Sequence, residues 1–235
     1  MKKLASIVIP TYNEEKNLPM TLKSIFGQES DYDIEVIVVD KKSTDKTAEI
    51  AQRMGCKVIE VETEGIPYAR KIGMINSRGE ILISASADTI YPQGWLQRVG
   101  DAIVKEGYAG VIGSIYALDG NFIENLGAEV LNLLATILNL LGLDYAAADN
   151  LVFSRRAYKK AGGFNRDIMT AEEVDIIKRL RKVGGVKYDP KAKCFVSLRR
   201  LRKWGYVKYL AFHIGNFLSS HFSGKSKEAY EAIRE

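Results

Sequence analysis

Residues 34–45 read IEVIVVDKKSTD, a largely β-branched apolar run that ends at Asp40 and continues in polar side chains. Such a short apolar run is typical of a strand buried in a parallel sheet. Polar residues directly after a buried strand lie at its carboxyl end, where open α/β sheets bind their ligands. We therefore predict a strand over residues 34–39 and a ligand-binding turn that begins at Asp40.

The same pattern recurs through the first ninety residues. Short apolar runs predict further strands at 4–9, 57–61 and 81–83, and apolar side chains at helical spacing predict helices at 18–26, 47–54 and 68–77. This alternation indicates an α/β fold with a Rossmann-like, mainly parallel central sheet and helices on both faces. Two more polar clusters, at 10–14 and 84–89, then share the sheet edge that Asp40 occupies.

The second half continues the domain without a repeat, a low-complexity tract or a Pro-rich linker. We predict helices at 95–106 and 171–183, strands at 111–116 and 150–154, and short strands near Val186 and Phe195. Residues 1–203 are expected to form one domain, and residues 204–235 a C-terminal amphipathic helical extension.

Two segments are more apolar than a sheet domain requires. We interpret residues 126–143, which are interrupted by Asn132 and Asn139, as a core helix, the alternative being the wall of a lipid groove. Residues 206–222 carry five aromatic side chains after a basic run, which suits either an interfacial membrane anchor or packing onto the domain. The longest apolar stretch, residues 130–143, falls short of the ~20 residues that a spanning helix needs.

Charge is unevenly distributed along the 235 residues. The chain has 34 basic and 29 acidic side chains, a net charge of +5, yet residues 178–208 hold twelve basic residues against Asp189, a net of +11. The rest therefore carries 5 − 11 = −6. The basic segment is either a solvated face or meets an anionic partner, such as a phosphate-bearing ligand or a membrane surface. Without a recognition module, the charge does not indicate nucleic-acid binding.

Cysteine usage and the N-terminus bear on the compartment. Cys56 and Cys194 are too few and too far apart for a disulfide framework or a zinc motif. The apolar run that follows Lys3 ends at Pro10, too soon for a signal peptide. We expect a cytoplasmic protein that is soluble or peripheral on the cytoplasmic face of a membrane.

A set of motifs in fixed order resembles the family 2 glycosyltransferases with the GT-A fold. The motifs are Pro10-Thr11-Tyr12-Asn13-Glu14, Val38-Val39-Asp40 followed by Ser43-Thr44-Asp45, Ala69-Arg70-Lys71 with Gly73, an acid after the fourth strand, Gly162-Gly163-Phe164, Glu172-Glu173-Val174-Asp175, and Arg199-Arg200 with Trp204. The resemblance spans nearly the whole chain. It implies transfer, with inversion, of a sugar from a nucleotide diphosphate to an acceptor, with a nucleotide-binding half at 1–90 and an acceptor half at 91–203.

The resemblance also implies roles for individual residues around the nucleotide. Nucleotide binding is expected of Thr11, Tyr12, Glu14, Asp40, Arg70 and Ser86. Carboxylates accept hydrogen bonds from ribose hydroxyls, and a tyrosine ring can stack on a base. Lys41 and Lys42 follow Asp40 where the family often has acidic or small residues, and they are either solvated or directed at a phosphate.

A divalent cation is the cofactor that the resemblance implies. The family's Asp-x-Asp motif, which holds Mg²⁺ or Mn²⁺ against the diphosphate, falls on Ser86-Ala87-Asp88. Only Asp88 retains a carboxylate as the metal ligand. Ser86 offers a neutral oxygen, so we expect weaker metal binding or help from basic side chains.

The acidic motif of the second half implies the catalytic base. Glu173 is our first choice and Glu172 the second, because inverting transfer needs a carboxylate to remove the acceptor proton. The alternative is structural: Thr170-Ala171-Glu172-Glu173 is also a capping-box pattern at a helix start. Contacts to the diphosphate or the acceptor are expected of Asp175, Arg199, Arg200 and Trp204.

The sequence thus predicts an inverting glycosyltransferase that uses a nucleotide-diphosphate sugar. Its acceptor is expected to be a hydroxyl, for example on a glycan, or a polyprenyl phosphate, and the two apolar segments favour a lipid-linked one. The alternative, motivated by Ser86 and Lys41, is a catalytically degenerate protein of the same fold that binds a sugar nucleotide or glycan without transferring it.

Overall fold

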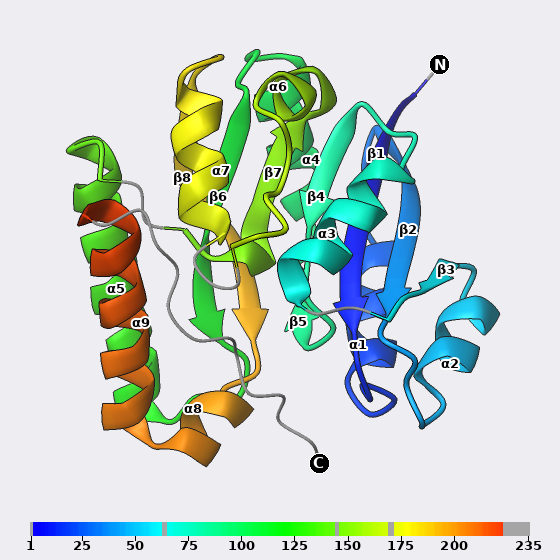
Figure 1. The fold of residues 1–235 in the computed structure, drawn as a ribbon, viewed down its shortest axis with the longest axis horizontal. Helices are drawn as coiled ribbons and strands as arrows, with labels where there is room; N and C mark the ends of the chain where they lie inside the picture. The colour runs from blue at the N-terminus through cyan, green and yellow to red at the C-terminus, as the bar shows by residue number, and fades with distance from the viewer. Residues whose placement is uncertain (1, 63–64, 144–145, 169–171, 223–235) are drawn as a thin grey trace.

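An eight-stranded sheet forms the centre of the computed structural model, which describes residues 2–62, 65–143, 146–168 and 172–222 (Figure 1). The strands are β1 (Lys3–Thr11), β2 (Tyr32–Asp40), β3 (Lys57–Glu60), β4 (Ile81–Ser84), β5 (Thr89–Ile90), β6 (Gly110–Ala117), β7 (Leu151–Ser154) and β8 (Val186–Val196). The helices are α1 (Leu18–Phe26), α2 (Thr47–Arg53), α3 (Ile66–Ile75), α4 (Trp95–Val104), α5 (Phe122–Leu140), α6 (Arg155–Lys160), α7 (Glu172–Arg181), α8 (Arg199–Trp204) and α9 (Tyr206–Phe222), with a 3₁₀ turn, η1, at Ala148–Asn150.

Sheet order is β3-β2-β1-β4-β7-β6-β8-β5. The first four strands pair in parallel, as expected of βαβ units. β7 runs antiparallel to both β4 and β6, β8 is parallel to β6, and β5 is antiparallel to β8. The predicted mainly parallel sheet is confirmed, and the second half adds the antiparallel pairs.

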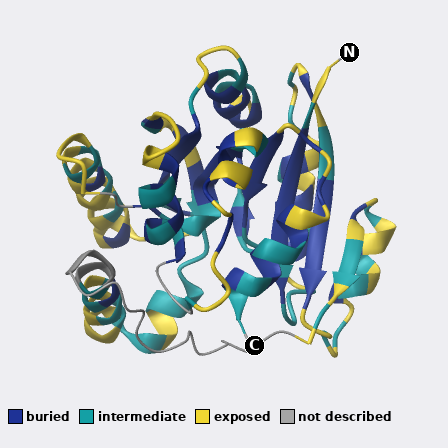
Figure 2. Ribbon diagram, turned by 45° about the horizontal axis from the view of Figure 1, so that its top comes forward, coloured by how far each residue is buried: buried dark blue, intermediate teal, exposed yellow. Residues whose placement is uncertain are grey.

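Two apolar layers cover the sheet. One contains Leu18 and Leu22 of α1 with Trp95 and Leu96 of α4, and the other contains Met74 of α3 with residues of α6 and α7. Figure 2 shows the buried strands at the centre and the exposed residues on the outer helices. Helices therefore cover both faces, as the sequence predicted.

Strand β8 corrects one expectation. The sequence predicted two short strands near Val186 and Phe195, but one strand spans both, with a register shift opposite Gly113 and Ser114 of β6. Pro190 lies inside this irregularity, where its missing N–H costs no ladder hydrogen bond. The hydrophobic periodicity of the sequence did not predict β5 or α6.

The interpretation of residues 126–143 as a core helix is wrong. Asn132 and Ala135 face the sheet, and the Asn132 side chain hydrogen-bonds both the N–H and the carbonyl of Ile115 in β6, at 3.2 and 2.8 Å. The leucines on the other side of α5 are exposed, as Leu133 (63%) and Leu126 (55%) illustrate. In α9, Phe217 and Phe222 have side chains outside the described ones.

The predicted domain boundary between residues 203 and 204 falls within α8. α9 packs against α7 and α8. Among the described residues, no helix is both long enough and apolar enough to cross a membrane.

Candidate active site

The carboxyl ends of β1 and β2 are joined through the buried Asp40 side chain, which is 1% exposed. Its carboxylate accepts hydrogen bonds from the Thr11 hydroxyl at 2.7 Å, and from the backbone N–H and hydroxyl of Ser43 at 2.7 and 2.6 Å. These bonds fix the turn after β2 against the end of β1. A direct bond from Asp40 to a ribose remains a prediction.

The loop after β1 is held in a defined conformation. Asn13 has a φ of 55°, a left-handed conformation that asparagine tolerates better than most residues. Its N–H donates to the Ser43 hydroxyl at 2.8 Å, and its side-chain oxygen accepts from the Thr44 N–H at 2.9 Å. The adjacent Tyr12 ring is half-buried, with Lys41 Nζ 5.7 Å from its centroid.

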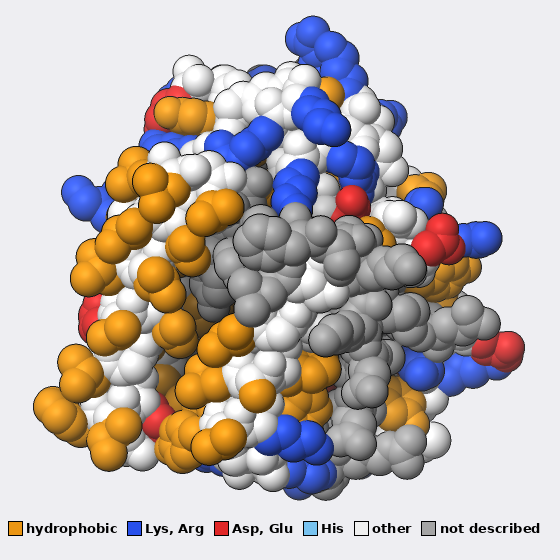
Figure 3. Space-filling view, turned by 60° about the vertical axis from the view of Figure 1, so that its left-hand side comes forward, with side chains coloured by type: hydrophobic (Ala, Val, Ile, Leu, Met, Phe, Trp, Pro, Cys, Tyr) orange, Lys and Arg blue, Asp and Glu red, His pale blue; other side chains and the backbone are white. Residues whose placement is uncertain are grey.

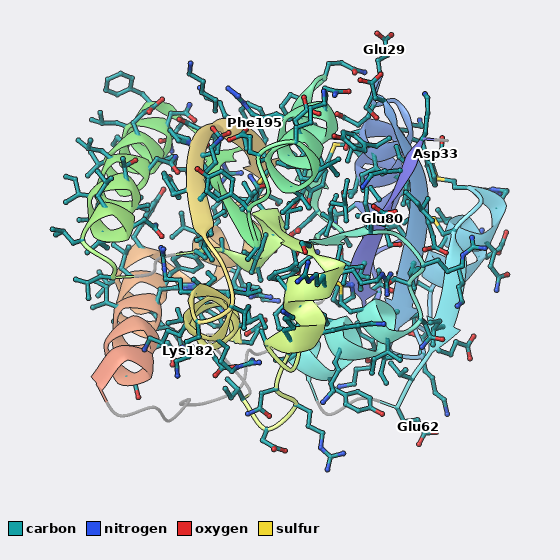
Figure 4. All side chains as sticks on the ribbon, turned by 90° about the horizontal axis from the view of Figure 1, so that it is seen from above. Glu29, Asp33, Glu62, Glu80, Lys182 and Phe195 are labelled. Atoms are coloured by element: carbon teal, nitrogen blue, oxygen red, sulfur yellow. The ribbon has the colours of Figure 1, made fainter. Side chains whose placement is uncertain are left out.

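Lys42 is directed away from this site. Its ammonium group pairs with Glu62, and both side chains are exposed. Glu62 lies at the outer edge of the molecule, beyond β3 (Figure 4). Of the two lysines after Asp40, Lys41 is therefore the one beside Tyr12.

A guanidinium group bridges two of the predicted site carboxylates. Arg199, at the start of α8, pairs with Glu14 and donates from Nε to Asp88 Oδ2 at 3.1 Å. Burial raises the pKa of Asp88 to about 6, with the Asp149 and Glu14 carboxylates adding to the rise and Arg199 opposing it. Asp88 is thus a half-buried carboxylate that one arginine compensates only in part.

Asp149 is a site residue that the sequence analysis missed. It lies in η1, accepts a hydrogen bond from the Ser86 hydroxyl, and has its Oδ1 3.8 Å from Nη2 of Arg70. Because β7 runs antiparallel to β4, residues just before β7 lie at the carboxyl end of β4. The polar pair Asp149-Asn150 before an apolar strand was the available signal.

Arg70 links the two halves of the site. From the buried face of α3 it donates to the Ser84 hydroxyl at 2.8 Å and to Glu172 Oε1 at 2.7 Å. Both side chains of the Arg70–Glu172 pair are 5% exposed. This pair fixes the start of α7 at the end of β4. Arg70, which was predicted to bind the nucleotide, is thus bonded to Glu172 of the acidic motif.

Glu173 lies beside this pair and is half-buried. Burial raises its pKa well above the ordinary 4.5, and the neighbouring Glu172 carboxylate raises it further. A carboxylate with a raised pKa is suited to accept a proton near neutral pH. The capping box that competes with this role needs Thr170, which lies outside the described residues.

Asp175, Arg200 and Trp204 make contacts with residues other than Glu14, Asp88, Asp149 and Glu172. Asp175 pairs with Arg179 one turn along α7, with Nε 3.1 Å from Oδ2. Arg200 lies 6.0 Å from the Trp204 ring centroid. Of the two adjacent arginines, Arg199 therefore contacts the site carboxylates, and Arg200 lies over an aromatic ring.

The oxygen atoms around Asp88 fit a hard divalent cation. Asp88 and Asp149 supply carboxylates and Ser86 a hydroxyl, which are ligand types that Mg²⁺ and Mn²⁺ accept. Within the described ranges, no three His, Cys, Asp or Glu side chains gather into a metal-binding group. A cation would therefore also need oxygen ligands from a phosphate substrate, as is usual for Mg²⁺.

Comparisons with known proteins agree with this architecture. The family model described as Glycosyl transferase family 2 matches residues 6–162. The chain is 36% identical over 115 residues to the 4,4'-diaponeurosporenoate glycosyltransferase of Staphylococcus haemolyticus, covering 46% of this chain and 30% of that protein. It is 33% identical over 108 residues to the dolichyl-phosphate hexose transferase of Haloferax volcanii, covering 46% of each. The chain thus spans less than half the length of these relatives.

A solved structure extends the likeness over nearly the whole chain. The mannosyltransferase of Pyrobaculum calidifontis, in complex with GDP-Man and Mn²⁺, matches with a TM-score of 0.71 and 19% identity over 98% of this chain and 66% of that chain. At this identity the likeness establishes the common fold. The ligands belong to that protein.

Proposed function

Given that the chain belongs to glycosyl transferase family 2, we propose that it transfers a sugar, with inversion, from a nucleotide-diphosphate donor to a lipid-linked acceptor. One observation carries the proposal. The buried Arg70–Glu172 pair joins the acidic motif of α7 to the strand end that bears Ser86 and Asp88. An acceptor base and a diphosphate site then share one edge of the sheet, as a single displacement requires.

Donor binding falls to the loops after β1, β2 and β4. Tyr12 offers a ring face for a base, and Thr11, Glu14, Asp40 and Ser86 complete the predicted nucleotide set. Arg199 pairs with the carboxylates of Glu14 and Asp88. It is suited to bind a diphosphate, since guanidinium groups bind phosphate oxygens in a bidentate manner. Its bonds to Glu14 and Asp88 would rearrange when the donor binds.

A divalent cation is part of the proposal. Asp88, with Asp149 and Ser86, would hold Mg²⁺ or Mn²⁺, which neutralises charge on a leaving diphosphate. Asp149 compensates for Ser86, which stands where the family motif has its first carboxylate. The Mn²⁺ in the mannosyltransferase complex supports this choice of cofactor.

Glu173 is the proposed base, with Glu172 held in its ion pair. As the acceptor oxygen bonds to the anomeric carbon, its proton passes to the Glu173 carboxylate, and the bond from that carbon to the diphosphate oxygen breaks. The raised pKa of Glu173 favours a hydroxyl acceptor, because a phosphate is already anionic and needs no base. A polyprenyl phosphate is the second candidate, favoured by the dolichyl-phosphate relative.

The proposal includes a peripheral location on the cytoplasmic face of a membrane, where a lipid-linked acceptor would be found. The test is a transfer assay with UDP-, GDP- and dTDP-sugars, Mn²⁺ and lipid acceptors, alongside calorimetry of the same donors. Labelled lipid product supports transfer. Tight donor binding without turnover for any donor would favour a degenerate sugar-nucleotide or glycan-binding protein.

A further inference from the structure

Exposed apolar side chains concentrate on one edge of the molecule. Of the eighteen large hydrophobic side chains that are exposed among the described residues, fifteen lie in residues 122–143 and 206–214. The remaining three are Phe26, Ile75 and Val183. Figure 3 shows the apolar side chains spread over α5 and α9. Soluble monomers rarely expose a continuous apolar surface of this extent.

Helix α5 has the reverse of ordinary amphipathicity. Two of its polar side chains face the protein: Asn132 bonds to Ile115 of β6, and Glu124 is 7% exposed. Its apolar side chains face outward at helical spacing. These are Phe122 (81%), Ile123 (74%), Leu126 (55%), Val130 (58%), Leu131 (42%), Leu133 (63%), Leu134 (47%), Ile137 (46%) and Leu140 (81%). Water is thus a poor environment for the outer face of α5.

The start of α9 is bound to the start of α5. Glu124 accepts hydrogen bonds from Arg202 of α8 at 3.0 Å and from the Tyr206 hydroxyl at 3.0 Å, and Arg202 also bonds Asp119 at 2.6 Å. α9 lies beside α5 at this edge of the molecule (Figure 1), and it exposes Val207 (84%), Leu210 (43%) and Ile214 (56%). We call this surface, residues 122–143 with 206–214, the α5–α9 face.

Basic and aromatic side chains border the α5–α9 face. Residues 200–208 contain four basic side chains and no acidic one, and Arg202 among them bonds Asp119 and Glu124. Arg200 and Lys208 lie over the Trp204 ring, at 6.0 and 5.2 Å from its centroid. An aromatic ring with two cations over it, in the segment that leads into the exposed apolar side chains of α9, has the chemistry of the boundary between anionic lipid headgroups and acyl chains.

We propose that the α5–α9 face docks on a lipid bilayer that contains anionic lipids, lying in the interface without crossing it. Charge complementarity selects this occupant. A second copy of the face would offer only Glu124 and Glu129 from α5, and Glu124 is already bonded to Arg202. Anionic headgroups supply the counter-charges, and the acyl boundary takes up the leucines.

Docking deepens the proposed function by naming the partner that brings a lipid-linked acceptor, although docking itself does not depend on transfer. Helix α8 connects the two regions. Arg199 at its start contacts Glu14 and Asp88 in the candidate site, and Trp204 at its end borders the α5–α9 face. An acceptor headgroup at the bilayer surface would therefore lie near the candidate site.

Vesicle flotation tests the docking. The chain is mixed with phosphatidylcholine vesicles, with and without phosphatidylglycerol, over a range of salt concentrations. We expect flotation with the anionic vesicles that weakens with salt. L126S/L133S/I137S should abolish it, whereas the matched triple F26S/I75S/V183S, made from the exposed apolar residues elsewhere, should float like the original chain.

The basic border is tested separately. K203E/K208E should lower the vesicle partition coefficient by about 25-fold or more, since each cation near an anionic surface contributes roughly fivefold. K16E/K23E, on exposed lysines outside the face, is the control of equal charge. Circular dichroism confirms that each variant is folded.

Trp204 gives a readout that does not depend on substituting the apolar face. Lipids brominated on the acyl chains should quench its fluorescence, and the quenching should disappear in W204F, since Trp95 is 2% exposed in the core. Absence of flotation with anionic vesicles at moderate salt would overturn the proposal. A dimer in light scattering that L126S/L133S/I137S converts to monomer would also overturn it, in favour of a second copy as the occupant.

Discussion

Arg70→Met is expected to destabilise the fold far more than an ordinary loss of an ion pair. Arg70 and Glu172 are each 5% exposed and 2.7 Å apart, so the substitution leaves a buried carboxylate without its partner. Breaking a buried pair from one side costs about 3–5 kcal/mol. The bond from Nε to Ser84 is lost too, although the Ser84 hydroxyl keeps its own bond to the Ala148 carbonyl at 2.7 Å. We expect a total loss within that range.

Equilibrium unfolding in urea, followed by circular dichroism, measures the change in the free energy of unfolding. The double variant R70M/E172L removes both charges and should recover to within about 1–2 kcal/mol of the original chain. Arg53→Met is the surface control: its pair with Glu49, at 3.9 Å, is exposed and should cost less than about 0.5 kcal/mol. A loss below about 1 kcal/mol in R70M would refute the view that this pair holds the two halves of the site together.

Glu173→Gln should lower kcat about 100-fold or more with a hydroxyl acceptor, and full activity would instead indicate a phosphate acceptor. Because the pKa of Glu173 is raised, proton acceptance is lost as pH falls through a value above the ordinary 4.5, and a kcat–pH profile with its acid limb at or below 4.5 would contradict this. Asp149→Asn should weaken Mn²⁺ binding about tenfold in electron paramagnetic resonance titrations with a nucleoside diphosphate, whereas Asp167→Asn, on an 80% exposed carboxylate, should not. Arg199→Ala should weaken nucleoside diphosphate binding by roughly 10- to 100-fold in calorimetry, and an equal effect of Arg200→Ala would speak against the assignment of Arg199.

Hydrophobic periodicity was sufficient for most of the fold. The predicted strand at 34–39 lies inside β2, and the helix predicted at 18–26 coincides with α1. Periodicity alone does not give pairing direction, and this is why Asp149 was missed: its position depends on β7 running antiparallel to β4. The two-residue strand β5 is too short to produce a pattern.

The outer face of α5 shows a second limit of the sequence. A stripe of leucines at helical spacing predicts an amphipathic helix, but it does not say which side faces the protein. Here the Asn132 side chain bonds the N–H and the carbonyl of Ile115 in β6, as a neighbouring strand would do. The side of α5 that carries Asn132 therefore faces the sheet. The sequence also does not tell which of the adjacent arginines reaches the candidate site. Only tertiary contacts show that Arg199 bonds Asp88 and that Arg200 lies over the Trp204 ring.

Transfer of a labelled sugar to a lipid-linked acceptor is the decisive measurement for inverting sugar transfer by this chain. The purified chain, Mn²⁺ and anionic vesicles containing lipid-linked acceptors are incubated with a panel of labelled nucleotide-diphosphate sugars, and the lipid product is examined by nuclear magnetic resonance. We expect a glycolipid whose anomeric configuration is inverted relative to the donor, and no product with Asp88→Asn. Retained configuration, or no product from any donor that binds tightly, would contradict it.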